Sequence, residues 1–203
     1  MDIEAVIRKI QKKLGIEVDG KAGPQTWSAI YESVVGTDSR AAPKIAALTE
    51  AVDARSEKVI ATLLPEVRPY ARSLVLKAAA SGITIKVIGG TRTFEEQDAL
   101  YAKGRPNNGP IVTNARGGRS NHNFGIAFDI GVFEGGKYLG ESPKYKAVGV
   151  LGEQLGLEWG GNWKTFKDAP HFQLRPSWAE TMAESAMLAE LRKRKTHGVT
   201  AFA

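Results

Sequence analysis

The chain contains no cysteine, so disulfide bonds and thiolate metal ligands are excluded. A metal ion must therefore be held by histidine, aspartate or glutamate, and only three histidines are present: His122, His171 and His197. No stretch approaches the roughly 18 apolar residues of a membrane span, so no membrane insertion is expected. The first residues also lack the basic head and apolar run of a secretory signal, which predicts synthesis in a cytoplasm without a signal peptide.

The composition is that of an ordinary globular protein. The 203 residues are 42% hydrophobic and 25% charged, enough for one good-sized domain or for a core domain with a small satellite. The net charge is +6, which fits either attraction to a polyanion or a merely basic protein. The densest basic run, Arg192 to Lys195, is interpreted as the solvated end of a helix.

The first 36 residues have the pattern of two helices around a tight loop. Apolar residues recur at helical spacing over 3–14, and Gly15 ends that helix. Asp19 and Gly20 form a turn signal, and Pro24 suits the first turn of a second helix. The sequence therefore predicts a small helical module over 1–36, followed by a linker over 37–47.

The rest of the chain alternates between helical and strand patterns. Helices are expected over 45–63, from Pro65 to about 81, over 94–103, over 143–155 and from 177; strands are expected over 83–88, 125–133 and 171–174. A loop fills 104–121, and 134–137 is a hairpin turn. This order predicts an α+β domain over 48–178 with a small antiparallel sheet, and a basic helix and tail over 179–203.

Two separated segments carry residue types suited to a metal. His122 lies on the loop that leads into the strand ending at Asp129, and the small Ala127 shares a face with that aspartate. Taken alone, this pair fits ordinary hydrogen bonding as well as metal binding. The second segment adds Asp168 and His171. Two histidines and one carboxylate make a three-ligand zinc site with a position open for water, as catalysis requires.

These motifs, Ser-x-His-x-x-Gly-x-Ala-x-Asp followed by Asp-x-Pro-His, resemble those of the D-alanyl-D-alanine carboxypeptidase family of the VanY type. Within that family the chain looks most like the phage L-alanyl-D-glutamate endopeptidases. The resemblance covers roughly residues 60–178, including Gly89 to Gln97, Leu100 to Arg105 and Val112 to Ala115. Several motifs in the right order are more specific than one short motif.

The resemblance implies a role for each matching residue. His122, Asp129 and His171 resemble the zinc ligands, and Asp168 resembles the general base. Arg92 resembles the arginine that stabilises the transition state. Ser120 looks like a second-shell or substrate-side residue, and Gln97 is expected to support the Arg92 loop. His197 has no counterpart and is placed on a surface helix.

Some of these residues have a structural alternative. Arg92 can be an ion-pair partner of Glu95 or Glu96, and Asp168 can be a cap or an orienter of a zinc-bound histidine. In that case Glu158 is the rival base. Three nearby aromatic residues fit either the wall of a cleft or the core: Trp159, Trp163 and Phe166.

The first 36 residues resemble the peptidoglycan-binding repeat of many wall hydrolases. The resemblance implies contact with the cell wall through five residues: Asp19, Gly20, Gly23, Thr26 and Trp27. The alternative is a helical hairpin that packs on the main domain and binds nothing.

The expected function is therefore that of a zinc-dependent endolysin that binds one catalytic zinc ion and cuts the L-alanyl-D-glutamate bond of peptidoglycan after holin-type release. We expect a monomer whose partner is peptidoglycan, with no specific nucleic acid. The alternatives are a D-alanyl-D-alanine carboxypeptidase and a non-catalytic zinc module such as the related hedgehog signalling domains. Nucleic-acid binding would rest on charge alone.

Overall fold

The computed structural model describes residues 2–22, 26, 29–30, 51–105 and 110–203. The chain forms two compact units, residues 1–44 and 45–203, and each is described by itself. Most of the second predicted helix, the predicted linker, Gly23 and Trp27 lie outside the described residues.

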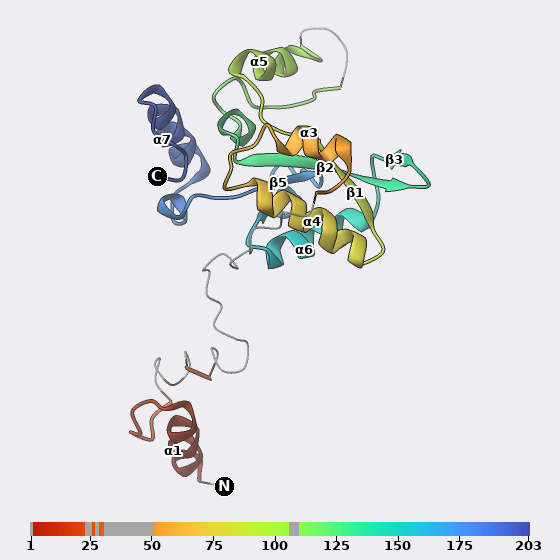
Figure 1. Ribbon diagram of the computed structural model, residues 1–203. Coiled ribbons are helices and arrows are strands. Elements are labelled where there is room, and N and C mark those ends of the chain that lie inside the picture. Colours follow the sequence, from red (N-terminus) through yellow and green to blue (C-terminus); the bar gives the residue numbers. More distant parts are fainter. Residues whose placement is uncertain (1, 23–25, 27–28, 31–50, 106–109) are drawn as a thin grey trace. The chain divides into compact units, whose positions relative to one another are not determined.

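The first unit contains α1 (Ile3–Leu14), which confirms the helix predicted there (Figure 1). Asp2 caps its N-terminus by accepting from the backbone N–H groups of Glu4 and Ala5. Gly15 ends the helix in the left-handed conformation, with φ of 68°, which glycine adopts without steric cost.

The second unit contains five α-helices among its described residues: α3 (Ala54–Ile60), α4 (Arg68–Ala80), α5 (Phe94–Ala102), α6 (Lys144–Gln154) and α7 (Glu184–Thr196). Its strands are β1 (Thr84–Gly89), β2 (Ala127–Glu134), β3 (Lys137–Leu139), β4 (Glu158–Trp159) and β5 (His171–Gln173). Short 3-10 helices are η1 (Asn121–Phe124), η2 (Gly160–Asn162) and η3 (Ser177–Ala179). The predicted α+β class with a small antiparallel sheet is confirmed.

The sheet has the strand order β1-β2-β5-β4, with β3 also paired to β2, and every pair is antiparallel. In the β2–β5 pair, Phe128 lies opposite Phe172 and Asp129 lies opposite His171. Because side chains alternate between the two faces of a sheet, these two pairs point in opposite directions. One face therefore builds the core, and the other builds the candidate site.

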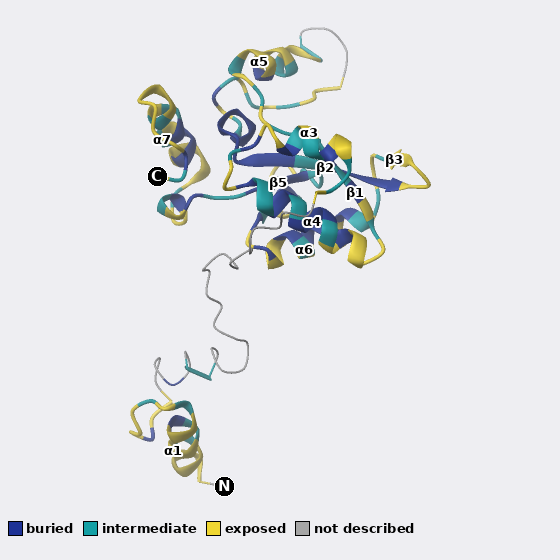
Figure 2. Cartoon of the chain, viewed as in Figure 1, coloured by how far each residue is buried: buried dark blue, intermediate teal, exposed yellow. Residues whose placement is uncertain are grey.

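The core lies between the sheet and its helices. The rings of Phe128 and Phe172 stack with centroids 5.9 Å apart, and both residues are fully buried. Helices α3 and α4 pack against β1, and α6 packs against α4 and β4. Figure 2 shows the buried central strands between these helices.

Two predicted helices differ from the structure near their starts. Residues 45–50 of the first lie outside the described residues and 51–53 are not helical; α3 begins at Ala54, where Asp53 caps it by accepting from the N–H groups of Arg55 and Ser56. The helix predicted from Ser177 is divided into η3 and α7, which begins at Glu184. The apolar spacing predicted neither the non-helical residues 51–53 nor the break between η3 and α7.

The C-terminal segment packs against the rest of the second unit. Met187, Leu188 and Leu191 of α7 form a second apolar cluster with Phe124 and Ile126. The basic run ends the helix as predicted, and Lys193 and Lys195 are exposed, but two side chains of the run also bind the segment before β2. Arg192 donates to the carbonyl of Gly118 at 2.8 Å, and Lys195 donates to that of Asn123 at 3.0 Å.

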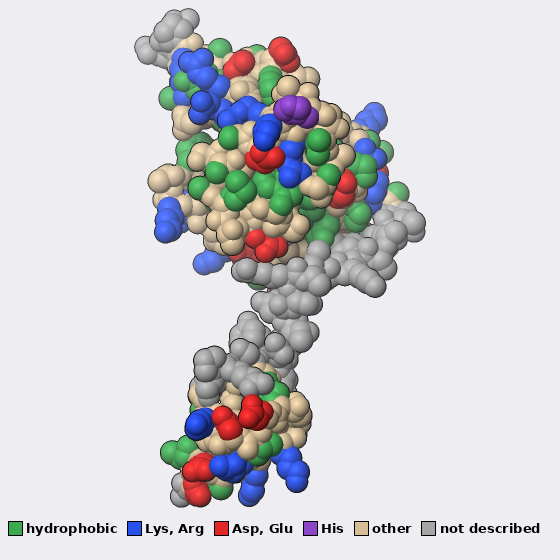
Figure 3. All heavy atoms as spheres, turned by 90° about the vertical axis from the view of Figure 1, so that its left-hand side faces the viewer, with side chains coloured by type: hydrophobic (Ala, Val, Ile, Leu, Met, Phe, Trp, Pro, Cys, Tyr) green, Lys and Arg blue, Asp and Glu red, His purple; other side chains and the backbone are tan. Residues whose placement is uncertain are grey.

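On the side of the molecule that carries α7, basic side chains lie among acidic and apolar ones (Figure 3). That face therefore does not present one continuous basic stripe, the pattern typical of a nucleic-acid-binding surface. Within the described part of the chain, no helix combines the length and apolarity needed to cross a membrane.

Candidate active site

The antiparallel register and one short helix bring the three predicted metal ligands together. Asp129 and His171 face each other across β2 and β5. His122 comes from η1, just before β2, and is 2% exposed. Its backbone carbonyl accepts from the N–H of Arg92 at 3.1 Å, which ties this turn to the segment after β1.

Three atoms of these residues form a nearly equilateral triangle. His122 Nε2 lies 3.2 Å from Asp129 Oδ1 and 3.2 Å from His171 Nδ1, and His171 Nδ1 lies 3.3 Å from Asp129 Oδ1. Despite these short distances, Asp129 Oδ1 is buried and has no partner with hydrogen-bond geometry. A buried carboxylate oxygen without a partner is costly and calls for a cation.

The outer nitrogens of the two imidazoles indicate which tautomers are present. His122 Nδ1 lies 2.8 Å from the carbonyl oxygen of Gly90, so Nδ1–H donates there and Nε2 carries a lone pair. His171 Nε2 lies 3.0 Å from Gln173 Oε1, so Nε2–H donates there and Nδ1 carries a lone pair. The two rings and the carboxylate therefore direct two nitrogen lone pairs and one oxygen at a single point, which suits a metal ion.

The electrostatics of the site also favour a positive charge. Burial acts to raise the pKa of Asp129, but the two imidazoles outweigh it and hold that pKa well below its usual value. Burial acts to lower the pKa of His171, but the Asp129 carboxylate outweighs it and the pKa is raised. The site therefore stabilises a cation next to the ionised Asp129 carboxylate.

The dimensions of the triangle fit zinc. Ligands about 2.0–2.1 Å from a tetrahedral zinc ion lie about 3.3 Å from one another. The three observed separations, 3.2, 3.2 and 3.3 Å, agree with that edge length. The nitrogen and oxygen donors are those zinc accepts, and three protein ligands leave one position for water.

Two glycines complete the site, and residue-by-residue reading of the sequence did not assign them a role. Gly89 lies opposite Asp129 in the β1–β2 pair, and a Cβ there would be 2.6 Å from Asp129 Oδ2. The space beside the carboxylate therefore depends on Gly89 on the neighbouring strand. Gly90 supplies the carbonyl that orients His122. Their signal was the Gly89-Gly90 pair directly after the predicted strand.

Asp168 and Arg92 both lie in the wall of one cleft of about 800 Å³ that also includes His122 and His171. Burial raises the pKa of Asp168, and the charge of Asp129 raises it further, against the influence of His171, His122 and Arg92. A raised pKa makes a carboxylate a better proton acceptor near neutral pH. Arg92 Nη1 lies 4.0 Å from Asp129 Oδ2, and its buried Nε has no hydrogen-bond partner.

The structure bears on two of the alternative interpretations. Among the described residues, Arg92 makes no ion pair with Glu95 or Glu96, and Glu96 instead closes the capping box of α5 with Thr93. Glu158 is engaged on both oxygens, one by Arg175 and one by Gln173 at 2.6 Å. Its carboxylate is thus less available as a base than that of Asp168, whose side chain forms no ion pair within the described part of the chain.

Gln97 supports a different segment from the one predicted. Its Nε2 donates to the carbonyl of Ala115 at 2.9 Å and to Thr113 Oγ1 at 3.4 Å, rather than to the Arg92 loop. The 113–115 segment lines the cleft, as does Ser120. Gln97 therefore supports the segment that forms one wall of the cleft.

The three aromatic residues divide between cleft and core. Trp163 lies with its ring centroid 4.9 Å from that of His171, and Phe166 is about half exposed; both line the cleft. Trp159 also borders the cleft but is 9% exposed, and its Nε1–H donates to the carbonyl of Ala169 at 2.8 Å.

In the first unit, a buried glutamine organises the loop that was predicted to bind the wall. Gln11 Nε2 lies 2.6 Å from Asp19 Oδ1 and 2.9 Å from Thr26 Oγ1, and Gln11 Oε1 accepts from the N–H of Gly20 at 2.8 Å. Thr26 is 2% exposed, so it shapes the loop from inside. The structure gives no account of Gly23 and Trp27, which lie outside the described residues.

Comparisons with known proteins identify both units. The model of a D-alanyl-D-alanine carboxypeptidase family matches residues 113–174, and that of a peptidoglycan-binding domain matches residues 2–30. The peptidoglycan L-alanyl-D-glutamate endopeptidase CwlK of Bacillus subtilis is 40% identical over 126 residues, which are 57% of this chain and 75% of the relative.

The L-alanyl-D-glutamate peptidase of Listeria phage A118 is 32% identical over 124 residues, which are 59% of this chain but only 40% of that protein. Among solved structures, the L-Ala D-Glu endopeptidase ChiX of Serratia marcescens is 27% identical with a TM-score of 0.48, covering 61% of this chain and 88% of that chain.

Asp129 and His171 on a small antiparallel sheet, His122 in the turn before β2 and a further acid in the same cleft form the site of a metallopeptidase. The chain belongs to the M15 peptidase family, the family of the D-alanyl-D-alanine carboxypeptidases, and carries a peptidoglycan-binding domain before it.

Proposed function

We propose that this protein is a zinc-dependent peptidoglycan endopeptidase that hydrolyses the L-alanyl-D-glutamate bond of the stem peptide. The observation that carries the proposal is the triangle of His122, Asp129 and His171 in a cleft shared with Asp168 and Arg92. The choice of bond is supported by the Bacillus subtilis relative, whose name states that activity.

Each side chain of the site would have its own role in hydrolysis of the peptide bond. His122 Nε2, Asp129 Oδ1 and His171 Nδ1 would hold the zinc ion. When bound, zinc lowers the pKa of water to about 7 and polarises a carbonyl group. Asp168 would accept the proton of the attacking water and return it to the leaving amine of D-glutamate. Arg92, whose ion pair with Asp129 measures 4.0 Å, would donate to the oxyanion of the tetrahedral intermediate.

A D-alanyl-D-alanine carboxypeptidase is the second candidate, because the matching family model carries that description. The two activities use the same zinc ligands and base, so the site does not separate them. They differ in the product: the endopeptidase exposes a D-glutamate amino terminus, and the carboxypeptidase releases free D-alanine.

The test is a digest of Gram-negative sacculi, analysed by mass spectrometry for new amino termini and free D-alanine. Wild type and Asp168→Ala are compared, each after chelator treatment and after zinc is added back. We expect D-glutamate termini that require zinc and are lost in the variant. Free D-alanine would transfer the protein to the carboxypeptidases. No cleavage by a zinc-loaded protein would favour a non-catalytic binding module.

We further propose that residues 48–178 are the catalytic domain, that the 1–36 module binds the wall, and that the protein is a monomeric endolysin, made in a host cytoplasm and released by a holin. The phage relative supports this role. Expression in bacteria with and without a membrane-pore protein tests it. Lysis that requires both proteins is expected, and lysis without the pore would contradict this route.

A further inference from the structure

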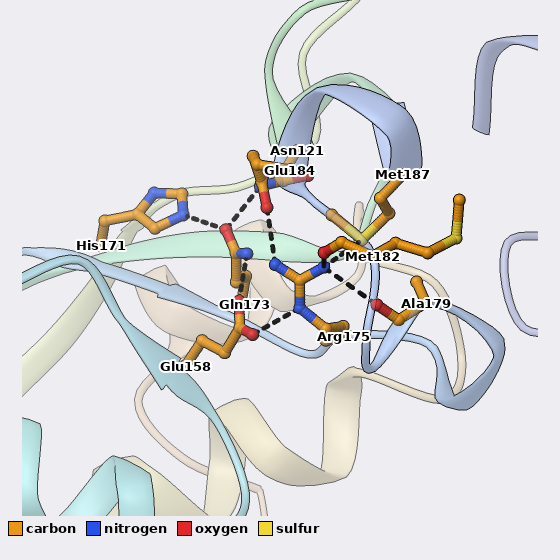
Figure 4. A network of polar contacts seen from close by, with 9 residues as sticks. All are labelled: Asn121, Glu158, His171, Gln173, Arg175, Ala179, Met182, Glu184 and Met187. Atoms are coloured by element: carbon orange, nitrogen blue, oxygen red, sulfur yellow. Dashed lines mark hydrogen bonds and ion pairs between the residues drawn. The ribbon is translucent and has the colours of Figure 1, made fainter. Parts of the chain in front are cut away.

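The Nε2 atom of His171 faces away from the metal site and contacts a network of polar side chains (Figure 4). This atom meets Gln173 Oε1, and Gln173 Nε2 donates to Glu158 Oε2 at 2.6 Å. Asn121 Nδ2 donates to the same Gln173 oxygen and to Glu184 Oε1. Both amide side chains are buried, with Gln173 only 1% exposed.

Arg175 joins the two carboxylates at the ends of this network. Its Nε donates to Glu158 Oε1, and its Nη2 donates to Glu184 Oε2 at 2.7 Å. Its Nη1 lies 3.3 Å from the carbonyl oxygen of Ala179. The guanidinium thus connects β4, the segment after β5 and the start of α7 into one support.

The network fixes the direction of both amides. An ionised carboxylate only accepts hydrogen bonds, so Glu158 requires the NH₂ group of Gln173 to face it, and Glu184 requires the same of Asn121. Gln173 Oε1 must then point at His171, and the same oxygen also accepts from Asn121 Nδ2. An oxygen at that point accepts only from an imidazole that carries its proton on Nε2, so the lone pair of His171 is on Nδ1.

We propose that Arg175, Glu158 and Glu184 are positioning residues that act through Gln173 and Asn121 to hold His171 in the tautomer that presents Nδ1 to the metal. The inference rests on the proposed function for the identity of the metal site. It makes α7, which begins at Glu184, part of the support of the active site although α7 lies outside the matched family segment.

The network offers a matched set of variants in the full-length chain. Gln173→Leu removes the acceptor. Glu158→Gln leaves the shape intact but places an NH₂ group opposite the NH₂ of Gln173, because Arg175 takes the new amide oxygen. The double variant Glu158→Gln with Gln173→Glu restores an acceptor toward His171. Tyr145→Phe is the control, since Tyr145 is also buried, donates to the carbonyl of Leu139, and lies outside both this network and the cleft.

Two measurements are made on each variant. Nitrogen NMR of the imidazoles in the metal-free protein, at about pH 9 and thus above the ordinary histidine pKa of about 6.5, reports the tautomer of His171. Competition with a chelating dye gives the zinc dissociation constant. Loss of an outer partner typically weakens metal binding about 10–100-fold.

We expect Nε2–H on His171 in wild type and in the double variant, and loss of that preference with 10–100-fold weaker zinc binding in Gln173→Leu and Glu158→Gln. Tyr145→Phe should match wild type in both measurements. The proposal would be overturned by wild-type zinc affinity in both single variants, by Nδ1–H on His171 in wild type, or by an equal loss in Tyr145→Phe.

The tautomer is measured without metal, so the two proposals can fail separately. A wild-type protein that binds no zinc but shows Nε2–H, lost in Gln173→Leu, would contradict the proposed cofactor and support the positioning network.

Discussion

Asp168 and Glu158, which both line the cleft, are the two carboxylates that were considered as the base. Asp168 has a pKa raised by burial and by Asp129, whereas Glu158 is tied to Arg175 and Gln173. We expect Asp168→Asn to lower kcat by about 10²–10⁴-fold, the usual contribution of a positioned base. The measurement is turnover of a soluble stem peptide, with zinc content determined on the same sample.

Zinc content should be unchanged in Asp168→Asn, because Asp168 is not among the three ligand side chains. Turnover within tenfold of wild type at full zinc occupancy would show that another group accepts the proton.

A second residue-scale prediction concerns stability and pH. Arg72 donates to Glu57 through Nε at 2.9 Å and Nη2 at 2.7 Å, and these bonds lower the pKa of Glu57. Folding therefore favours the ionised form of Glu57. The ion pair stabilises the folded protein at pH values above the pKa of Glu57 in the unfolded chain. This stabilisation is lost as the pH falls through the lower pKa of Glu57 in the folded protein. Glu57→Gln should cost about 1–3 kcal/mol at pH 7 and less under acid.

Urea unfolding at pH 7 and at about pH 3, below the ordinary Glu pKa of about 4.3, measures this difference. The control is Glu134→Gln. Glu134 and its partner Lys144 are both exposed, and exposed ion pairs contribute only about 0–1 kcal/mol to stability. A cost for Glu57→Gln that is equal at both pH values would contradict the assignment.

The residues of the site that the sequence predicted are those with their own motif. His122, Asp129, His171 and Asp168 lie in short patterns, and the structure brings them into one cleft with Arg92. The partners Asn121, Gln173 and Glu184 were not predicted, because they meet only through the β2–β5 register and the return of α7. Amide and carboxylate side chains that lie so far apart in the sequence form no recognisable sequence pattern.

At the scale of elements, helix α6 packs closely against the sheet because Gly152 has no side chain. A Cβ on Gly152 would lie 2.4 Å from the ring of Phe172, the residue that follows His171. Ala normally stabilises a helix by about 1 kcal/mol relative to Gly. Here we expect Gly152→Ala to destabilise the protein by about 1–3 kcal/mol, because the ring must move.

Thermal unfolding tests this, with Ala147→Gly at an exposed position of α6 as the comparison. That variant should lose only the propensity difference of about 1 kcal/mol. An increase in stability for Gly152→Ala would mean that the packing between α6 and β5 is looser than the structure shows.

Element types were predictable where the apolar period was clear, as in α1, α4 and β2. The start of α3 was not, because it depends on the Asp53 cap, and the break between η3 and α7 left no signal in the apolar pattern. Helix ends are set by individual hydrogen bonds, which a pattern of apolar residues does not encode.

At the scale of the whole molecule, the division into residues 1–44 and 45–203 predicts separable contributions. We expect a 45–203 fragment to retain turnover of small soluble peptides and to lose activity on intact sacculi, because the first unit matches a peptidoglycan-binding domain over residues 2–30. Initial rates on both substrates measure this, with the unfolding temperature of the fragment as the folding control.

Equal loss on both substrates by a folded fragment would contradict a wall-targeting role. A second variant, Gln11→Ala in the full-length chain, removes the side chain that holds Asp19, Gly20 and Thr26. It should reproduce the loss on sacculi without changing turnover of the soluble peptide.

The most direct test of the account is a crystal structure of the zinc-loaded protein with anomalous diffraction at the zinc edge. The account predicts one ion held by His122 Nε2, Asp129 Oδ1 and His171 Nδ1, with its remaining position open to the cleft that contains Asp168. An ion bound elsewhere, or ligation of His171 through Nε2, would contradict it.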